Sequence, residues 1–451
     1  QPVQIIALPR PVHIPLHDLS ALPDEGRERE AQRLATTEAK LPFNLSAGPL
    51  LRVSLLRLGP SEHVVLVTMH HIVSDGWSMN LLIQEMTSLY GAYAAGQEIR
   101  LPELPVQYAD YAVWQREWLQ GEVLERELAN WREHLSGAPA VLELPTDRPR
   151  PPVQTFQGRE VSVHFDPELA EGLQALSRAE GATLFMTLLA AWQVLLSRYS
   201  GQEDVCVGSY IANRNRADTE GLIGYFVNNL AFRTDLSGNP TFRQLLGRVR
   251  EVSFAAYAHQ DVPFELGLER LDPERDASRT PLVQTPFVLQ NTPAASADST
   301  GLGFSSVETA WTHANFDLTL WTREGPNGLV GLLEYSTDLF DAATIRRMVG
   351  HFVTLLRGAV ADPDRRIGEL ALLGEDERRR LLLEWNGNAV ERPRVAITGI
   401  GIISALGRGR ETTIKALHEG RSGIRPITSI DASSLACRIA GEVPADAAID
   451  G

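Results

Sequence analysis

The sequence predicts a mixed α/β (α+β) protein with two halves that each combine strands and helices. Two observations carry this prediction. Apolar β runs alternate with segments of helical period across residues 1–145 and again across 153–360. Between them, residues 143–154 are proline-rich, charged and without apolar periodicity, which is typical of a linker. A second linker is expected at 361–392. A further piece is expected at 393–451, and it begins with an apolar β run.

The elements of the first half follow from short local patterns. Two apolar runs around the turn GPSE predict a β-hairpin, and apolar residues at helical spacing predict amphipathic helices. In chain order we expect a strand at 2–8, a charged surface helix at 23–39, hairpin strands at 51–58 and 63–69, a helix at 77–95 and one helix over 108–135 with an aromatic stripe.

The second half is richer in apolar runs. Pro286 falls inside one predicted strand, and because proline cannot donate to a sheet, that strand should lie at an edge or a bulge. In order we expect a strand at 160–165, helices at 167–180 and 183–199, a strand at 203–211, an apolar run at 223–233, a helix at 241–258, strands at 283–290, 315–322 and 328–335, and a helix at 341–359.

Composition limits the possible partners and compartment. The net charge is −15, and apart from Lys40 and Lys415 all positive side chains are arginines without a basic block, so no nucleic-acid partner is expected. No apolar run is long enough for a membrane span, and the first residues do not form a signal peptide. Cys206 and Cys437 define no disulfide framework, so we expect a cytoplasmic protein. The first residue is not Met, so we expect a piece of a longer chain.

The stretch MHHIVSDGWS, residues 69–78, is the candidate site. It places His70, His71, Asp75 and Gly76 between an apolar strand and a helical pattern, a common position for catalytic groups. A buried histidine that serves only packing is the alternative. Adjacent residues on a strand point to opposite faces, and no further His or Cys cluster is near, so no metal site is predicted.

These residue types suit acyl transfer. An imidazole can take or position the proton of an attacking amine or alcohol. Asp75 could pair with a cation and hold the loop, and the N–H of Gly76 could meet a developing oxyanion. The GxSxG pattern of serine hydrolases is missing from the sequence, which weakens a hydrolase interpretation.

The stretch MHHIVSDGWS resembles the HHxxxDG motif of nonribosomal peptide synthetase condensation domains. The resemblance covers residues 1–387 and is highly specific, because five further segments stand in the order of that family's motifs. They are YADYAVW (108–114), IGYFVNNLAFR (223–233), HQDVPFE (259–265), RDASRTPL (275–282) and FDLTL (316–320).

The resemblance implies a chloramphenicol-acetyltransferase-like fold, with an N-lobe at 1–145, a C-lobe at 153–360 and an active site between them. It implies no directly bound cofactor. Donor and acceptor peptidyl carrier proteins would bring phosphopantetheine thioesters, and adenylation or polyketide synthase domains would be neighbours. The acceptor amine would attack the donor thioester, with His71 at the reacting amine and with His70 and Asp75 structural.

Other interpretations of the resemblance stay open. An epimerisation domain shares the HHxxxDG motif, and a non-catalytic module that docks carrier proteins would share the fold. Heterocyclisation domains are disfavoured, because they have Asp at the position of His70. In the family, a segment upstream of the first residue supplies an arginine partner, so Asp75 is expected to be unpaired here.

Several residues of the later motifs are candidates for the substrate tunnel or the lobe interface. Each has a plainer alternative: strand capping for the asparagines, helix initiation for the histidine segment, surface charge for the arginines and helix packing for the tryptophan. The candidates are Trp77, Asn228, Asn229, His259, Gln260, Asp261, Arg275 and Arg279.

The final piece resembles the start of a β-ketoacyl synthase, a protein of the thiolase fold, through RVAITGIGIISALG (394–407) and RIAGEV (438–443). Its glycine turn is not a dinucleotide fingerprint, because Ser404 stands where the third glycine belongs. The family's reactive Cys and two His would lie beyond residue 451, and Cys437 is not the nucleophile, so no catalysis is expected from this piece. The junction near residue 390 is either a natural fusion or an artefact.

Overall fold

The structure is a computed structural model that describes residues 3–8, 10–271, 276–290, 313–325 and 328–384, together with four short strands after residue 402. Residues 1–375 form one compact unit and residues 376–451 a second.

In the second unit, β10 (Ile403–Ser404) pairs antiparallel with β11 (Gly407–Arg408), and β12 (Ile424–Pro426) pairs antiparallel with β13 (Ile439–Gly441). Cys437 lies outside the described residues.

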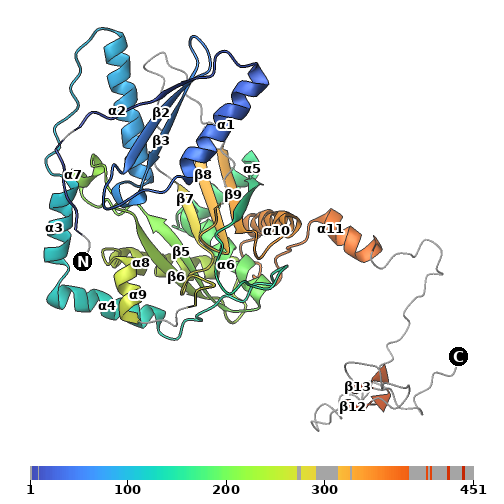
Figure 1. Ribbon diagram of the computed structural model, residues 1–451. Helices are drawn as coiled ribbons and strands as arrows, with labels where there is room; N and C mark the ends of the chain where they lie inside the picture. Colours follow the sequence, from blue (N-terminus) through green and yellow to red (C-terminus); the bar gives the residue numbers. More distant parts are fainter. Residues whose placement is uncertain are drawn as a thin grey trace. The chain divides into compact units, whose positions relative to one another are not determined.

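The first half contains a three-stranded sheet with the order β1-β2-β3. Strands β2 (Leu51–Arg57) and β3 (His63–Met69) form the predicted antiparallel hairpin, and helix α1 (Asp24–Lys40) contacts β3. Figure 1 shows β2 and β3 side by side, with α1 next to them. The strand expected at 2–8 is wrong, because the strand that forms is β1 (Leu16–Asp18), parallel to β2. The Leu55 N–H donates to the Pro15 carbonyl, so the pairing with β2 reaches back to Pro15, whose own nitrogen has no proton to donate.

Three helices complete the first half. Helix α2 (Gly76–Ala94) follows the histidine stretch, and α3 (Tyr108–Trp118) and α4 (Gly121–Leu135) come next. The single helix expected over 108–135 is therefore wrong. Gly121 has φ +55°, a left-handed conformation that interrupts the helix and that glycine adopts without strain.

The second half contains a four-stranded sheet and a separate strand pair. The sheet order is β4 (Gly158–His164), β9 (Gly328–Ser336), β8 (Leu318–Gly325) and β7 (Phe287–Gln290). Strand β7 lies at the edge, as predicted, but it starts directly after Pro286 and does not contain it. Strands β5 (Asp204–Ile211) and β6 (Asn228–Asp235) pair antiparallel.

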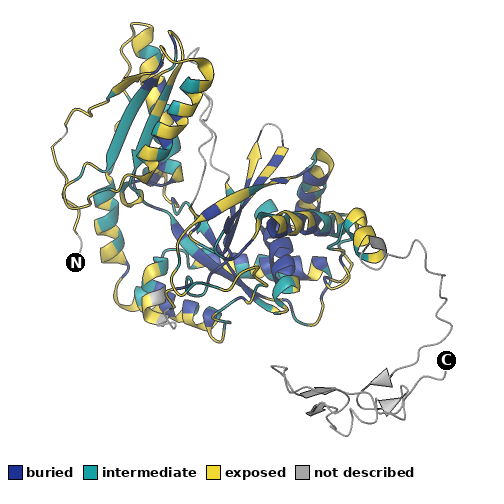
Figure 2. Ribbon diagram, turned by 45° about the vertical axis from the view of Figure 1, so that its right-hand side comes forward, coloured by how far each residue is buried: buried dark blue, intermediate teal, exposed yellow. Residues whose placement is uncertain are grey.

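Helices of the second half cover these strands and supply most of the core. They are α5 (Pro167–Ala179), α6 (Leu184–Ser200), α7 (Ala217–Glu220), α8 (Phe242–Ala258), α9 (Phe264–Leu271) and α10 (Ala342–Ala361). Every residue of α6 from Met186 to Leu196 is buried, which explains its apolar character all round. Figure 2 shows this concentration of buried residues in the second half, while the first half is mostly intermediate or exposed.

In the part of the chain that the structure describes, no single helix is long and apolar enough to span a membrane. One bent pair of helices, α5 with α6, reaches the required length and composition when the two are taken together.

The proline-rich stretch 143–154 has no regular structure, yet side chains fix it to the second half. Arg150 forms an ion pair with Asp317, whose side chains are 18% and 4% exposed. The Asp147 carboxylate accepts the Asp341 N–H and the Thr344 hydroxyl, both at 2.8 Å. The crossing between the halves is therefore held in place by polar contacts.

The compact unit also extends beyond α10. The Phe242 N–H donates to the Arg365 carbonyl, the Ile367 N–H donates to the Pro240 carbonyl, and Leu370 is buried. A short helix, α11 (Glu375–Arg379), then follows. The beginning of the linker expected at 361–392 is thus folded onto the second half.

Asp317→Asn should lower the free energy of unfolding by about 3 kcal/mol, because it leaves the Arg150 charge buried without its partner. Arg357→Ala is the control, since its pair with Asp166 is 61% and 41% exposed and should contribute less than about 1 kcal/mol. Urea denaturation of both variants measures the difference. Equal effects would show that the Arg150–Asp317 pair contributes no more to stability than an exposed ion pair.

Burial raises the pKa of the Cys206 thiol to about 12. In a Cys437→Ser chain, a thiol reagent at pH 8 should therefore react with Cys206 at least about 100-fold more slowly in the folded chain than in guanidinium chloride. Absorbance of the released leaving group follows both rates. Fast labelling of the folded chain would contradict the buried position.

Candidate active site

The histidine pair lies just after strand β3, where the chain turns into a short 3₁₀ helix, η1 (His71–Val73). The His70 Nδ1 atom accepts the Ile72 N–H at 3.0 Å, and the His70 ring packs edge-on against Phe43 at 5.8 Å. An accepting Nδ1 carries no proton, so His70 caps the turn with its ring fixed in one orientation. This contact agrees with the structural role implied for His70.

The neighbouring histidine has the opposite arrangement. The Nδ1 atom of His71 lies 3.0 Å from the Ser74 carbonyl oxygen, which can only accept. Nδ1 therefore carries the proton, and Nε2 keeps a free lone pair. His71 is exposed rather than sealed in the core, so this lone pair belongs to a ring that other molecules can reach.

Asp75 begins helix α2 and is buried. Its Oδ1 accepts both the N–H and the hydroxyl of Ser78 at 2.8 Å, and its Oδ2 accepts the Phe226 N–H at 3.0 Å. Arg214 Nη2 lies 3.2 Å from Asp75 Oδ1, with side chains 1% and 3% exposed. The expectation of an unpaired Asp75 is therefore wrong.

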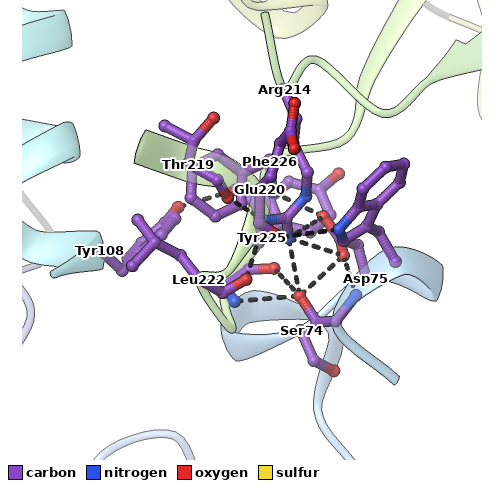
Figure 3. Close-up of polar contacts among 12 residues, drawn as sticks. Ser74, Asp75, Tyr108, Arg214, Thr219, Glu220, Leu222, Tyr225 and Phe226 are labelled. Carbon is purple, nitrogen blue, oxygen red and sulfur yellow. Dashed lines mark hydrogen bonds and ion pairs between the residues drawn. The ribbon is translucent and has the colours of Figure 1, made fainter. Parts of the chain in front are cut away.

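Arg214 belongs to the segment between β5 and β6 and was not found from the sequence. It donates to the carbonyls of Thr219 and Leu222 at 2.6 and 2.8 Å, and its guanidinium lies 4.1 Å from the centre of the Phe226 ring (Figure 3). Burial lowers the pKa of Arg214, and Asp75 opposes that shift. An arginine remains charged at neutral pH, so the pair is a true ion pair.

The second half contributes a short strip, 224–226, which crosses the base of α2. Ser78 Oγ lies 3.0 Å from the Gly224 nitrogen and 2.8 Å from its carbonyl oxygen, and the Tyr108 hydroxyl donates to the Tyr225 carbonyl at 2.8 Å. The Tyr225 ring stands edge-on to His71, with centroids 6.1 Å apart and planes at 82°. The strip therefore brings a second-half side chain to the histidine.

Gly76 is the first residue of α2, where the partial positive charge of the helix is concentrated. Apart from Gly76 itself, its two chain neighbours and the backbone of α2, no atom of the described chain lies within 4 Å of where a Cβ on Gly76 would stand. Trp77 donates its Nε1–H to the Glu220 carbonyl at 2.9 Å, which matches the helix-packing alternative for that residue.

Asn228 is buried and fully hydrogen-bonded. Its Nδ2 donates to the carbonyls of Gln260 and Val262 at 2.8 and 2.7 Å, and its Oδ1 accepts the Phe264 N–H at 3.0 Å. Its amide thus bridges β6 to the segment before α9, as the capping alternative predicted. Asn229 is half-buried beside a small apolar pocket that includes Trp131.

His259 ends helix α8 and does not begin the next helix, so the helix-initiation alternative is wrong for it. Its Nδ1 lies 2.7 Å from Glu127 Oε2 on α4. Burial, followed by the nearby Glu127, raises the pKa of Asp261. Arg279 forms a 2.8 Å ion pair with Asp276, and Arg275 lies outside the described residues.

These contacts divide the predicted residues into two groups. His71 and Asp75 are brought together with Arg214, Ser78 and the 224–226 strip. The HQDVPFE residues, 259–265, instead contact α4 and β6. Among the residues that the structure describes, no group of three or more His, Cys, Asp or Glu side chains could hold a metal ion.

Gly224→Ala should destabilise the chain by about 1–3 kcal/mol, because the new Cβ would overlap the ring of Tyr108. Gly247→Ala is the matched control. Its Cβ would meet no neighbour within 4 Å in the middle of α8, so the same change there should be neutral or stabilising by up to about 1 kcal/mol. Thermal unfolding distinguishes the two, and a tolerated Gly224→Ala would contradict the tight crossing.

Asp261→Asn should be more stable than wild type near pH 7. The pKa of Asp261 is raised in the folded chain, so ionisation of this carboxyl disfavours the folded state. The stability of wild type is therefore greatest below the pKa of the unfolded chain and falls as the pH rises through the pKa of the folded chain. The advantage should shrink towards pH 4. Asp276→Asn should behave oppositely, since hydrogen bonds from Ser278 lower the pKa of Asp276. Melting temperatures from pH 3.5 to 8 test both signs, and parallel curves would contradict them.

Comparison with solved structures defines the class of fold. The X-domain from teicoplanin biosynthesis matches with a TM-score of 0.73 and 31% identity, over 81% of this chain and 82% of that chain. The first condensation domain of the CDA synthetase matches with a TM-score of 0.62 and 24% identity, over 81% and 78%. The fold is the chloramphenicol-acetyltransferase-like fold of condensation domains, as expected.

Sequence comparison gives the family. The family model named condensation domain matches residues 1–382. A component of the linear gramicidin synthase of Brevibacillus parabrevis is 53% identical over 82% of this chain and 5% of its own length. Chondramide synthase cmdD of Chondromyces crocatus is 45% identical over 87% of this chain and 10% of its own length. The chain belongs to the condensation-domain family of nonribosomal peptide synthetases, whose members are acyltransferases.

Residues 392–450 match a different family model, that of the β-ketoacyl synthase N-terminal domain. This match confirms the resemblance predicted for 393–451. Strands β10 to β13 fall within the matched range.

Proposed function

We propose that this chain forms peptide bonds by acyl transfer between two carrier-protein-bound thioesters. The observation that carries the proposal is the 3.0 Å contact between His71 Nδ1 and the Ser74 carbonyl oxygen, which favours one tautomer of the ring. The Ser74 carbonyl holds the proton on Nδ1, which leaves Nε2 as an acceptor on an exposed ring within the family's motif. His70, with the opposite tautomer, serves the turn.

In the proposed reaction the acceptor amine nitrogen attacks the carbonyl carbon of the donor thioester. His71 Nε2 accepts or orients the proton of that amine while the C–N bond forms. The N–H of Gly76, at the positive end of α2, faces the developing oxyanion. The C–S bond then breaks, and the thiolate of the donor phosphopantetheine leaves and takes up a proton, giving an amide and a free thiol.

The proposed partners follow from the reaction. Donor and acceptor peptidyl carrier proteins supply both substrates on phosphopantetheine, so the chain itself needs no bound cofactor. Adenylation domains would load those carriers. The similarity of residues 392–450 to a β-ketoacyl synthase supports a neighbouring polyketide synthase in a hybrid, cytoplasmic assembly line.

A docking module without catalysis is the second candidate. It is favoured by the match to a solved complex of the X-domain and OxyB from teicoplanin biosynthesis, at 30% identity and a TM-score of 0.71. Carrier binding without product formation would distinguish this candidate from an acyltransferase.

His71→Ala should reduce dipeptide formation by about 10²–10⁴-fold, because the proton of the attacking amine loses its acceptor. The assay uses a carrier protein loaded with an alanyl thioester as donor and one loaded with glycine as acceptor, with the product measured by mass spectrometry. His63→Ala, an exposed histidine on β3, is the matched control and should keep the wild-type rate.

Equal rates for wild type and His71→Ala would overturn the assignment of His71. Saturable binding of both loaded carriers, with no dipeptide from the wild type, would favour the docking module.

A further inference from the structure

We propose that Tyr225 is a positioning residue for His71, and that Ser78 and Tyr108 of the first half hold it there. This inference deepens the proposed function and rests on it for its kinetic consequence. Its geometric part concerns only the orientation of the His71 ring.

The strip 224–226 is held through its backbone by the first half. The Gly224 N–H and carbonyl both bond to Ser78 Oγ, the Tyr225 carbonyl accepts from Tyr108, and the Phe226 N–H donates to Asp75. These are fixed points on three successive residues. The Tyr225 side chain, which projects from the middle of the strip, therefore has a fixed origin.

The hydroxyl group of Ser78 lies at the centre of this hydrogen-bond network. Its Oγ lies within 3.0 Å of the Gly224 nitrogen, the Gly224 carbonyl, Asp75 Oδ1 and Arg214 Nη2. A hydroxyl has one proton and two lone pairs, so two N–H donors occupy the lone pairs and two oxygens share the proton. Ser78 is 1% exposed, so water does not compete for these bonds.

Tyr108 holds the strip from the other side. Its ring packs edge-on to Phe226 at 5.1 Å, and it fills the space that a Cβ on Gly224 would need. Burial raises the pKa of the Tyr108 phenol, so the hydroxyl stays protonated and donates to the Tyr225 carbonyl at neutral pH. The strip is thus clamped between Tyr108 and the start of α2.

The clamped ring acts on the histidine. Tyr225 stands at 82° to the His71 plane, so its ring limits rotation of the imidazole. A flipped imidazole would take Nδ1 away from the Ser74 carbonyl and Nε2 away from its present direction. His71 is itself exposed, so packing on its open side gives it little support. The second half thereby supplies orientation that the first half lacks.

Loss of this ring should act on turnover more than on substrate binding, because a displacement of about 1 Å in a catalytic group can cost about 100-fold. Tyr225→Leu should lower kcat about 10–100-fold and change KM less than about threefold. Tyr225→Phe keeps the ring and should stay within about threefold of wild type. Tyr108→Phe removes one hydrogen bond to the strip and should fall between them.

The decisive measurement is nitrogen NMR of ¹⁵N-histidine-labelled full chain, with the His71 signals identified by their absence in His71→Ala. Wild type and Tyr225→Phe should show one tautomer, protonated at Nδ1. Tyr225→Leu should show averaging between tautomers. Tyr93→Leu is the control, because Tyr93 is 85% exposed on α2 and should leave the His71 signals unchanged.

An unchanged His71 spectrum in a folded Tyr225→Leu chain would overturn the inference. Equal kcat values for wild type and Tyr225→Leu would also overturn it. Melting temperatures establish folding, and if Tyr225→Leu unfolds, the same spectral comparison on Tyr108→Phe decides the question. If the Tyr225→Leu spectrum changes but the wild type makes no dipeptide, the proposed function is refuted and the positioning role of Tyr225 stands. If the wild type makes dipeptide and the Tyr225→Leu spectrum is unchanged, the positioning role is refuted and the proposed function stands.

Discussion

The buried ion pair between Asp75 and Arg214 is the interaction on which the site depends. Two charges with side chains 1% and 3% exposed lose most of their hydration, and their attraction alone does not reliably offset that loss. Additional hydrogen bonds are therefore required. Asp75 receives them from Ser78 and the Phe226 N–H, and Arg214 gives them to Thr219 and Leu222.

Each of these extra bonds also joins a different part of the chain. Asp75 caps helix α2, Arg214 orders the segment between β5 and β6, and the Phe226 N–H ties down the strip that carries Tyr225. Satisfying the buried charges therefore assembles the site. Backbone groups of the same turn contact both imidazole rings directly, and the buried charges act on His71 only through the strip that carries Tyr225.

The two halves contribute unequally to this arrangement. The second half has a core centred on the fully buried middle of α6, whereas the first half buries few large side chains. The proposed catalytic histidine nevertheless belongs to the first half. Contacts from the second half, through Arg214 and the 224–226 strip, therefore give the first half its rigidity around the histidines.

Local patterns in the sequence determined the hairpin, most helices, the edge position of β7 and the motif that reveals the family. These features depend on residues close in sequence, where periodicity, proline and turn chemistry act. The same reasoning failed for the strand at 2–8, since a strand exists only where it finds a partner, and for the helix broken at Gly121, since a glycine inside a helical pattern does not reveal its φ.

Only the tertiary structure decided the partner of Asp75, the fixed course of the proline-rich crossing and the approach of Tyr225 to His71. Arg214 lies 139 residues from Asp75, and Arg150 lies 167 from Asp317. Such pairs leave no periodic trace, because charge matching over that distance is ambiguous among many arginines and carboxylates. The sequence thus determined which groups are present for chemistry, and the fold decided which of them meet.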